Sequence, residues 1–217
     1  MSYKKYAGQT RWIETNICNL SYGMFEGAGE HDIPILEPVH IDNLESIPLQ
    51  GFNFALGDPN PQDKAVHFFL HDYQFERVWK YPDRYTDVLS KFKFVLSPDF
   101  SPYSDMPKAL QVYNIYRNRW CARYWQEQGL TVVPTVTWSD EYTFKICLDG
   151  IPKHSTIAIS TMGEGRFANW KNLTSHWDIL LDTLEPDTVL LYGTDLRDRL
   201  IRGNIVFKKR ISSKVAI

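Results

Sequence analysis

The stretch from Val66 to Met106, VHFFLHDYQFERVWKYPDRYTDVLSKFKFVLSPDFSPYSDM, decides the expected fold. It contains two short apolar runs, each followed by an aspartate, with an amphipathic segment between them. Short apolar runs next to turn residues are typical of buried strands, and a helix between two of them predicts a parallel βαβ unit. Asp72 and Asp99 would then lie at the carboxyl ends of neighbouring strands, where α/β proteins place binding and catalytic groups.

The same alternation continues along the chain. Pro82 is expected to break a helix, and Pro134 demands a bulge or an unpaired position in its strand. The repeat predicts an α/β fold, a reduced or incomplete (β/α) TIM-like barrel with mostly parallel strands, with an open doubly wound sheet as the alternative. Strands are predicted at 51–56, 66–70, 92–96, 131–138, 156–161, 188–192 and 204–209, and helices at 74–91, 106–128, 140–148 and 170–184.

Length and composition favour one globular domain of 217 residues, with 43% hydrophobic and 23% charged residues. Residues 1–46 are punctuated by proline and glycine and predict an irregular N-terminal cover. Residues 47–193 hold the α/β core, and residues 194–217 form a basic C-terminal segment.

The whole chain has a net charge of −2, but its end is basic, with seven basic residues and one acidic residue between 197 and 217. Such a segment can contact phosphates, and the alternative is a solubilising face on a last strand. The tail residues considered for nucleic-acid contact are Arg202, Lys208, Lys209 and Arg210.

Three cysteines, far apart and without CxxC spacing, favour free thiols in a reducing compartment. The N-terminus has no apolar signal region, and no run of apolar residues is long enough to span a membrane. We therefore expect a cytosolic protein with no membrane partner. Dinucleotide, P-loop, esterase and zinc-protease motifs do not occur, and we expect no cofactor. His67 and His71 have a spacing that could serve a metal, but a core or rim position is the preferred interpretation.

Polar residues follow five predicted strands at one end, which is the strongest functional signal. Carboxylates that converge in a cleft raise one another's pKa and can divide into a general acid or base and an ionised partner. Asp72, Asp99 and Asp140 are the candidate catalytic residues. For Asp99 and Asp140 the alternative is a helix N-cap.

Other side chains near these strand ends are candidates for binding. Aromatic rings can stack on a base, arginine can grip a phosphate as a planar fork, and a glycine turn can offer N–H groups to an anion. Asp105 is either a site carboxylate or a helix N-cap with Pro107 at the first helical position. For Arg77 and for Arg117, Arg119 and Arg123 on the long helix, a solvated face is the favoured alternative. The candidate binding residues are Tyr73, Arg77, Asp105, Trp138, Ser160, Gly163 and Tyr192, and Gly165 belongs to the same turn as Gly163.

Several blocks of the sequence resemble a domain-of-unknown-function family found in phage and mobile-element proteins. The resemblance spans roughly 47–193 and leaves out the basic tail. It implies a phage or prophage origin in a bacterial cytoplasm and no known reaction. The blocks are VHFFLHDYQFERVW (66–79), FKFVLSPDFSPYSDMPKALQVYNIYRNR (92–119), GLTVVPTVTW (129–138), CLDGIPKHSTIAIST (147–161) and VLLYG (189–193).

A weaker, topological likeness is to tRNA-guanine transglycosylases and related phage DNA transglycosylases. Asp72, Asp99, the turn at 160–163 and Asp195 follow the order of the aspartates and the small-residue turn in those barrels. The chain departs from them because it has neither a DSGGF-type motif nor a cysteine cluster for zinc. This likeness would imply base exchange.

The leading hypothesis is therefore a phage or mobile-element enzyme that acts on a nucleotide, a nucleobase or a nucleic acid through strand-end carboxylates. The alternative is a non-enzymatic inhibitor or sequestering protein that binds a host protein or a signalling nucleotide. A third hypothesis is DNA binding through the basic tail alone.

Overall fold

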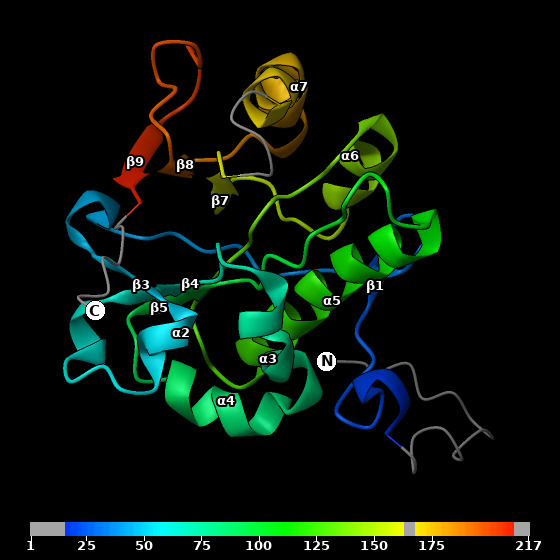
Figure 1. The fold of residues 1–217 in the computed structure, drawn as a ribbon, viewed down its shortest axis with the longest axis vertical. Coiled ribbons are helices and arrows are strands. Elements are labelled where there is room, and N and C mark those ends of the chain that lie inside the picture. The colour runs from blue at the N-terminus through cyan, green and yellow to red at the C-terminus, as the bar shows by residue number, and fades with distance from the viewer. Residues whose placement is uncertain (1–15, 163–167, 211–217) are drawn as a thin grey trace.

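The computed structural model describes residues 16–162 and 168–210 (Figure 1). Strands and helices alternate from Leu49 to Gly193, as expected of an α/β protein. Along the chain the elements are η1 (Ile17–Asn19), β1 (Gly27–Ala28), β2 (Ile33–Pro34), η2 (Leu44–Ser46), β3 (Leu49–Gly51), α2 (Phe52–Ala55), η3 (Pro61–Asp63), β4 (Ala65–His67), η4 (Asp72–Gln74), α3 (Glu76–Lys80), α4 (Pro82–Leu89), β5 (Phe94–Leu96), α5 (Lys108–Glu127), β6 (Val132–Val133), α6 (Glu141–Cys147), β7 (Thr156–Ser160), α7 (Ala168–Leu184), β8 (Thr188–Gly193) and β9 (Ile205–Lys209), where η marks a 3-10 helix.

Two parallel sheets form the centre of the molecule. One has the strand order β3-β4-β5-β6 and the other the order β7-β8-β9. A short antiparallel pair, β1-β2, lies in the N-terminal part of the chain. The structure is therefore a mixed α/β fold with parallel sheets, and the prediction of mostly parallel strands is confirmed.

Pro134 marks the point where the chain passes from one sheet to the other. Thr135 forms an isolated parallel bridge with Ala158 of β7. The Pro134 carbonyl accepts from the Ala158 N–H at 2.8 Å, and the Val136 N–H donates to the Ala158 carbonyl at 2.8 Å. Since proline has no N–H to give to a ladder, the strand predicted across 131–138 is interrupted there, as expected.

Three clusters of buried side chains make up the core. On one face of the first sheet, Phe68 and Val95 pack with residues of α3, α4 and α5. On one face of the second sheet, Ile157 and Val189 pack with residues of α6 and α7. The third cluster joins the opposite faces of both sheets, with residues such as Leu96 and Leu190, so these two faces lie against each other.

Helix boundaries follow local chemistry in most places. The break expected at Pro82 separates α3 from α4. The helix predicted over 106–128 is α5, and Pro107 is its N-cap residue, so the prediction of Asp105 as N-cap with Pro107 inside the helix is wrong. Within 16–162 and 168–210, no helix is long and apolar enough to cross a membrane.

The strand predicted over 51–56 is wrong. The strand β3 ends at Gly51, and Phe52 begins the short helix α2. Phe52 is fully buried and stacks on Phe68 with ring centroids 5.0 Å apart, whereas Phe54 is 49% exposed. Two phenylalanines two residues apart imitate strand periodicity, but contacts with distant residues decide which ring is buried.

Candidate functional site

A cavity of about 570 Å³ lies at the carboxyl ends of strands from both parallel sheets. Five of the seven strands of these sheets contribute their last residue or a residue close to it, and Asp99 follows a short way after a sixth, β5. The cavity therefore brings together four of the candidate site residues, which are Asp99, Ser160, Tyr192 and Arg210.

Three stacked rings form one wall of the cavity. Tyr192 lies 4.9 Å from the Phe69 ring at an interplanar angle of 23°, and 4.6 Å from the His67 ring. All three residues line the cavity. Phe69 was missed by the sequence interpretation, although Ala65, His67 and Phe69 alternate along one strand direction and so point to the same side.

His67 contributes a neutral ring to this wall. Burial lowers the pKa of His67 to about 4, and its Nδ1 accepts a hydrogen bond from the Phe69 N–H at 3.2 Å. His71 is exposed and lies beyond the end of β4, so the two histidines do not share a strand. In the part of the chain that the structure describes, no three His, Cys, Asp or Glu side chains are grouped to hold a metal.

Asp99 is the most perturbed carboxyl group of the cavity. Burial and the nearby charge of Asp72 raise its pKa to about 7, against a weaker opposing hydrogen bond from Thr137. Its Oδ1 is buried and has no hydrogen-bond partner among the described residues. The N-cap alternative for Asp99 is wrong, because the next helix, α5, begins at Lys108.

Asp72 lies beside the cavity and is held firmly. Its carboxylate accepts hydrogen bonds from the Ser101 backbone N–H at 3.0 Å and from the Ser101 hydroxyl at 2.9 Å. Ser101 lines the cavity, so Asp72 orders the loop that follows Asp99. The two aspartates expected at neighbouring strand ends thus interact electrostatically, with Asp99 buried and Asp72 hydrogen-bonded.

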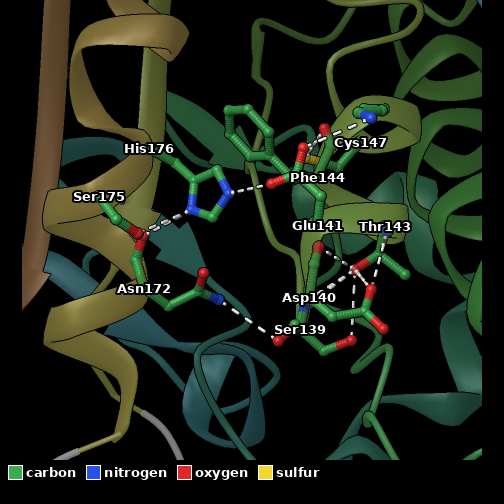
Figure 2. Close-up of polar contacts among 10 residues, drawn as sticks. Ser139, Asp140, Glu141, Thr143, Phe144, Cys147, Asn172, Ser175 and His176 are labelled. Atoms are coloured by element: carbon green, nitrogen blue, oxygen red, sulfur yellow. Dashed lines mark hydrogen bonds and ion pairs between the residues drawn. The ribbon is translucent and has the colours of Figure 1, made fainter.

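Asp140 is the N-cap of α6. Its Oδ1 accepts from the Thr143 N–H at 2.9 Å, and the Thr143 hydroxyl lies 3.0 Å from the Asp140 N–H, which completes a capping box (Figure 2). Lys108 forms an ion pair with the same carboxylate. Burial raises the pKa of Asp140, but the Lys108 and Thr143 hydrogen bonds outweigh it and lower the pKa overall. The N-cap alternative for this residue is confirmed.

Replacing Asp140 by alanine is expected to lower the free energy of unfolding by about 1 kcal/mol, because the first turn of α6 loses its cap. Replacing it by serine should preserve most of that stability, since a serine hydroxyl also caps a helix. Urea denaturation of both variants checks the prediction. Equal losses for alanine and serine would mean that the Lys108 ion pair, and not the cap, is the stabilising contact.

A smaller side pocket of about 40 Å³ adjoins the cavity and shares Asp99 and Ser160 with it. Trp138, a predicted stacking residue, lines this side pocket and not the main cavity. Its ring packs edge-on against Phe144 at 5.2 Å and against His176 at 6.0 Å.

Asn172 of α7 lines the side pocket, and polar contacts join α7 to the segment around the start of α6 (Figure 2). The Asn172 side chain donates to the Ser139 carbonyl at 3.3 Å. His176 connects the two helices, with Nε2 2.9 Å from the Glu141 carboxylate and Nδ1 2.8 Å from the Asn172 carbonyl. The hydrogen bond from His176 lowers the pKa of Glu141.

Three of the remaining candidate binding residues, Tyr73, Arg77 and Asp105, line neither pocket. Tyr73 is 79% exposed, and its ring is parallel to that of His71 at 6.1 Å. Arg77 places its guanidinium over the rings of Phe52 and Tyr85, at 5.1 and 5.7 Å. Asp105 is exposed ahead of α5. Gly163 and Gly165 lie outside the described residues.

The basic tail is anchored to the protein at two of its four candidate residues. Arg202 forms ion pairs with Asp178 and Asp182, and Lys208 donates to the carbonyls of Glu45 and Ile47 at 2.8 Å each. Lys209 is exposed, and Arg210 lines the cavity.

Two of the helix arginines are structural. Arg117 and Arg119 are buried, with 8% and 1% exposure, so the solvated-face interpretation is wrong for both. Arg117 pairs with Glu76 and covers the Phe100 ring, whereas Arg123 forms ion pairs with Glu37 and Glu127.

The fold and the cavity define an α/β protein with a polar and aromatic site at the carboxyl ends of parallel strands. The chain belongs to the family described as Domain of unknown function (DUF4417), whose model matches residues 25–207. The expectation of a domain-of-unknown-function family with phage members is confirmed.

Two relatives come from mycobacteriophages. The Gene 1 protein of Mycobacterium phage L5 is 38% identical over 177 residues, which cover 78% of this chain and 74% of that protein. The Gene 1 protein of Mycobacterium phage D29 is 45% identical over 130 residues, which cover 59% of this chain and 48% of that protein. No solved structure matches the chain significantly. Neither the family nor these relatives supports the transglycosylase likeness.

Proposed function

We propose that this protein is a phage-type enzyme that acts on a nucleotide, a nucleobase or a nucleic acid in the strand-end cavity. The observation that carries the proposal is the buried Asp99 carboxyl, whose pKa burial and Asp72 raise to about 7, in the wall of that cavity. A group with a pKa near the working pH is suited to general acid or base catalysis, because it can both give and take a proton.

The two aspartates would have different roles. Asp99 would transfer the proton, whereas Asp72 would remain a fixed acceptor held by the two Ser101 hydrogen bonds. A pair of carboxyl groups placed in different environments is a common basis for such a division. Asp140 is not used in this proposal, since its carboxylate caps α6 and pairs with Lys108.

The shape and chemistry of the cavity support a nucleotide as the ligand class. The rings of Tyr192 and Phe69 offer an apolar surface for a planar base, and base–aromatic stacking contributes about 1–3 kcal/mol. Arg210 lines the same cavity and could bind a phosphate as a planar fork. A volume of about 570 Å³ is in the range of ligand-binding clefts.

We infer further that strands β3 to β9 form an incomplete TIM-like barrel around the third core cluster. The bridge between Thr135 and Ala158 joins the two sheets, and residues from both sheets share that cluster. The Lys208 ammonium spans the remaining opening by donating to the carbonyls of Glu45 and Ile47, just ahead of β3. A cavity at the carboxyl ends of the strands is the position that this architecture uses for its active site.

The proposal is tested by the ligands that the purified protein retains and by the nucleotides that it binds. Mass spectrometry of the denatured full chain should detect a nucleobase or a nucleotide. In calorimetric titrations, Tyr192→Leu should weaken nucleotide binding about tenfold, because it removes a stacking ring, whereas Tyr192→Phe should leave it nearly unchanged.

Three results separate this proposal from its alternatives. A protein that carries no nucleotide and binds none in titrations would overturn it. Tight nucleotide retention without turnover would favour the sequestering protein. Nucleic-acid binding that is insensitive to Tyr192→Leu but falls steeply with salt would favour contact through the basic tail.

A further inference from the structure

Two residues that line the side pocket each carry a buried polar atom whose hydrogen bonds are unmade. Asp99 Oδ1 and the Trp138 Nε1–H are buried, and neither has a hydrogen-bond partner among the described residues. Both residues line the side pocket together with Thr137, Ser160 and Asn172. Asp99 Oδ1 is a hydrogen-bond acceptor when the carboxylate is ionised, and the Trp138 Nε1–H can only donate.

Unpartnered atoms of this kind are costly, so their occurrence on two residues that line one small pocket requires an explanation. A buried donor or acceptor without a partner costs about 1–3 kcal/mol. The pocket, at about 40 Å³, has room for only a few heavy atoms beyond the main cavity. A ligand group that carries a hydrogen-bond acceptor next to an N–H donor would satisfy both side chains at once.

We propose that the side pocket is a specificity subsite that receives the carbonyl and adjacent ring N–H of a lactam-type nucleobase edge. The ring N–H donates to Asp99 Oδ1, and the carbonyl oxygen accepts from the Trp138 Nε1–H. The inference rests on the proposed function, because the rest of the base would lie in the main cavity against Tyr192 and Phe69.

The geometry of the surrounding residues supports this assignment. The Trp138 ring is held by its edge contacts with Phe144 and His176, so its N–H direction is set by packing. His176 itself contacts the Glu141 carboxylate of α6 and the Asn172 carbonyl of its own helix (Figure 2). The donor is therefore preorganised, which favours discrimination between ligands that differ in a single polar edge.

Matched pairs of nucleotides test the proposal. Uridine and cytidine monophosphates differ at the edge in question, as do inosine and adenosine monophosphates, because only the first of each pair carries a carbonyl beside a ring N–H. In titrations of the full chain at about pH 8, where Asp99 is ionised, the first of each pair should bind about tenfold tighter.

Two tryptophan variants test whether the Trp138 N–H causes this preference between nucleotides. Trp138→Phe keeps an aromatic ring but removes the N–H, and should reduce the preference to about twofold or less. Trp125→Phe is the matched control. The Trp125 Nε1 is also buried without a partner among the described residues. Trp125, however, lies in the first core cluster and lines neither pocket. The control variant should keep the full preference.

The outcomes distinguish failure of the subsite from failure of the proposed function. Nucleotides that bind without preference, or a preference that survives Trp138→Phe, would overturn the subsite while the proposed function stands. Absence of any nucleotide binding by the wild-type chain would overturn both. Loss of the preference in Trp125→Phe as well would assign the effect to general loosening of the core and would also overturn the subsite.

Discussion

The Asp99→Asn variant is expected to be more stable than the wild-type protein above about pH 7 and, on the proposed function, to lose at least about 100-fold in turnover of the nucleotide substrate. Asparagine has nearly the same shape but neither ionises nor transfers a proton. A substitution that stabilises the fold and abolishes activity is the expected behaviour of a residue held in an unfavourable environment for the sake of function.

The pH dependence follows from the direction of the pKa shift. The ordinary pKa of the Asp99 carboxyl is 3.8, and burial with the Asp72 charge raises it to about 7 in the folded protein. Between these values the folded state binds more protons than the unfolded state, so stability falls as pH rises through this range. The loss should reach about 2–4 kcal/mol above pH 7, and the asparagine variant should not show it.

Urea denaturation at several pH values from about 4 to 8 measures this difference. His67 acts in the opposite direction, because burial lowers its pKa from 6.5 to about 4 and stability rises with pH across that window. This contribution cancels when wild type and variant are compared at each pH. Asp87→Asn, at an exposed position on α4, is the control and should change nothing. A wild-type minus variant difference that is flat with pH would falsify the assignment.

The Arg119→Met variant is expected to lose about 3–5 kcal/mol of unfolding free energy. The guanidinium of Arg119 is fully buried and donates to the Thr135 carbonyl at 3.0 Å, the Cys147 carbonyl at 2.5 Å and Asn118 Oδ1 at 2.6 Å. Methionine fills much of the volume but takes one donor from each of these buried acceptors, and among the described residues Asn118 Oδ1 and the Thr135 carbonyl keep only the hydrogen bonds from the Ser97 hydroxyl and the Asn118 amide. Because Thr135 joins the two sheets, the loss should affect the whole fold.

Thermal and urea denaturation of Arg119→Met and Arg119→Lys check this prediction. Lysine restores the charge but not the planar fork, so it should recover only part of the stability. Arg84→Met is the control, since Arg84 is exposed on α4 and its removal should cost about 0.5 kcal/mol or less. A cost for Arg119→Met as small as that of the control would mean that water satisfies the carbonyls of Thr135 and Cys147.

Some features of the structure were predictable because they depend on neighbouring residues. Pro82 breaks the helical segment, Pro134 interrupts its strand, and Asp140 caps α6, each through chemistry within a few residues. The strand β3 was misplaced for the opposite reason. Phe52 and Phe54 alternate like strand residues, but only packing on Phe68 and Tyr85 decides that Phe52 starts a helix.

The candidate site likewise contains residues that the local sequence indicated and residues that only the fold revealed. Asp99 and Tyr192 were identified because residues at the carboxyl ends of parallel strands gather on one side. Phe69 and Thr137 were missed, since strand alternation places Phe69 on the same side as His67 but does not show whether that side is a cavity wall or an ordinary core position. Arg119 was misjudged as solvated, because a charged residue on a long helix is usually exposed and its carbonyl partners belong to distant segments.

The sequence by itself determined the alternation of strands and helices, the parallel sheets and the group of polar strand ends to which Asp72 and Asp99 belong. These follow from apolar periodicity and turn chemistry, which act over short distances along the chain. Only the tertiary structure decided that Asp99 is buried near the charge of Asp72, and that Asp99 and Trp138, each with an unpartnered polar atom among the described residues, line the same small pocket. Desolvation and charge interactions depend on residues that the fold brings together, so the chemistry of the site is a property of packing.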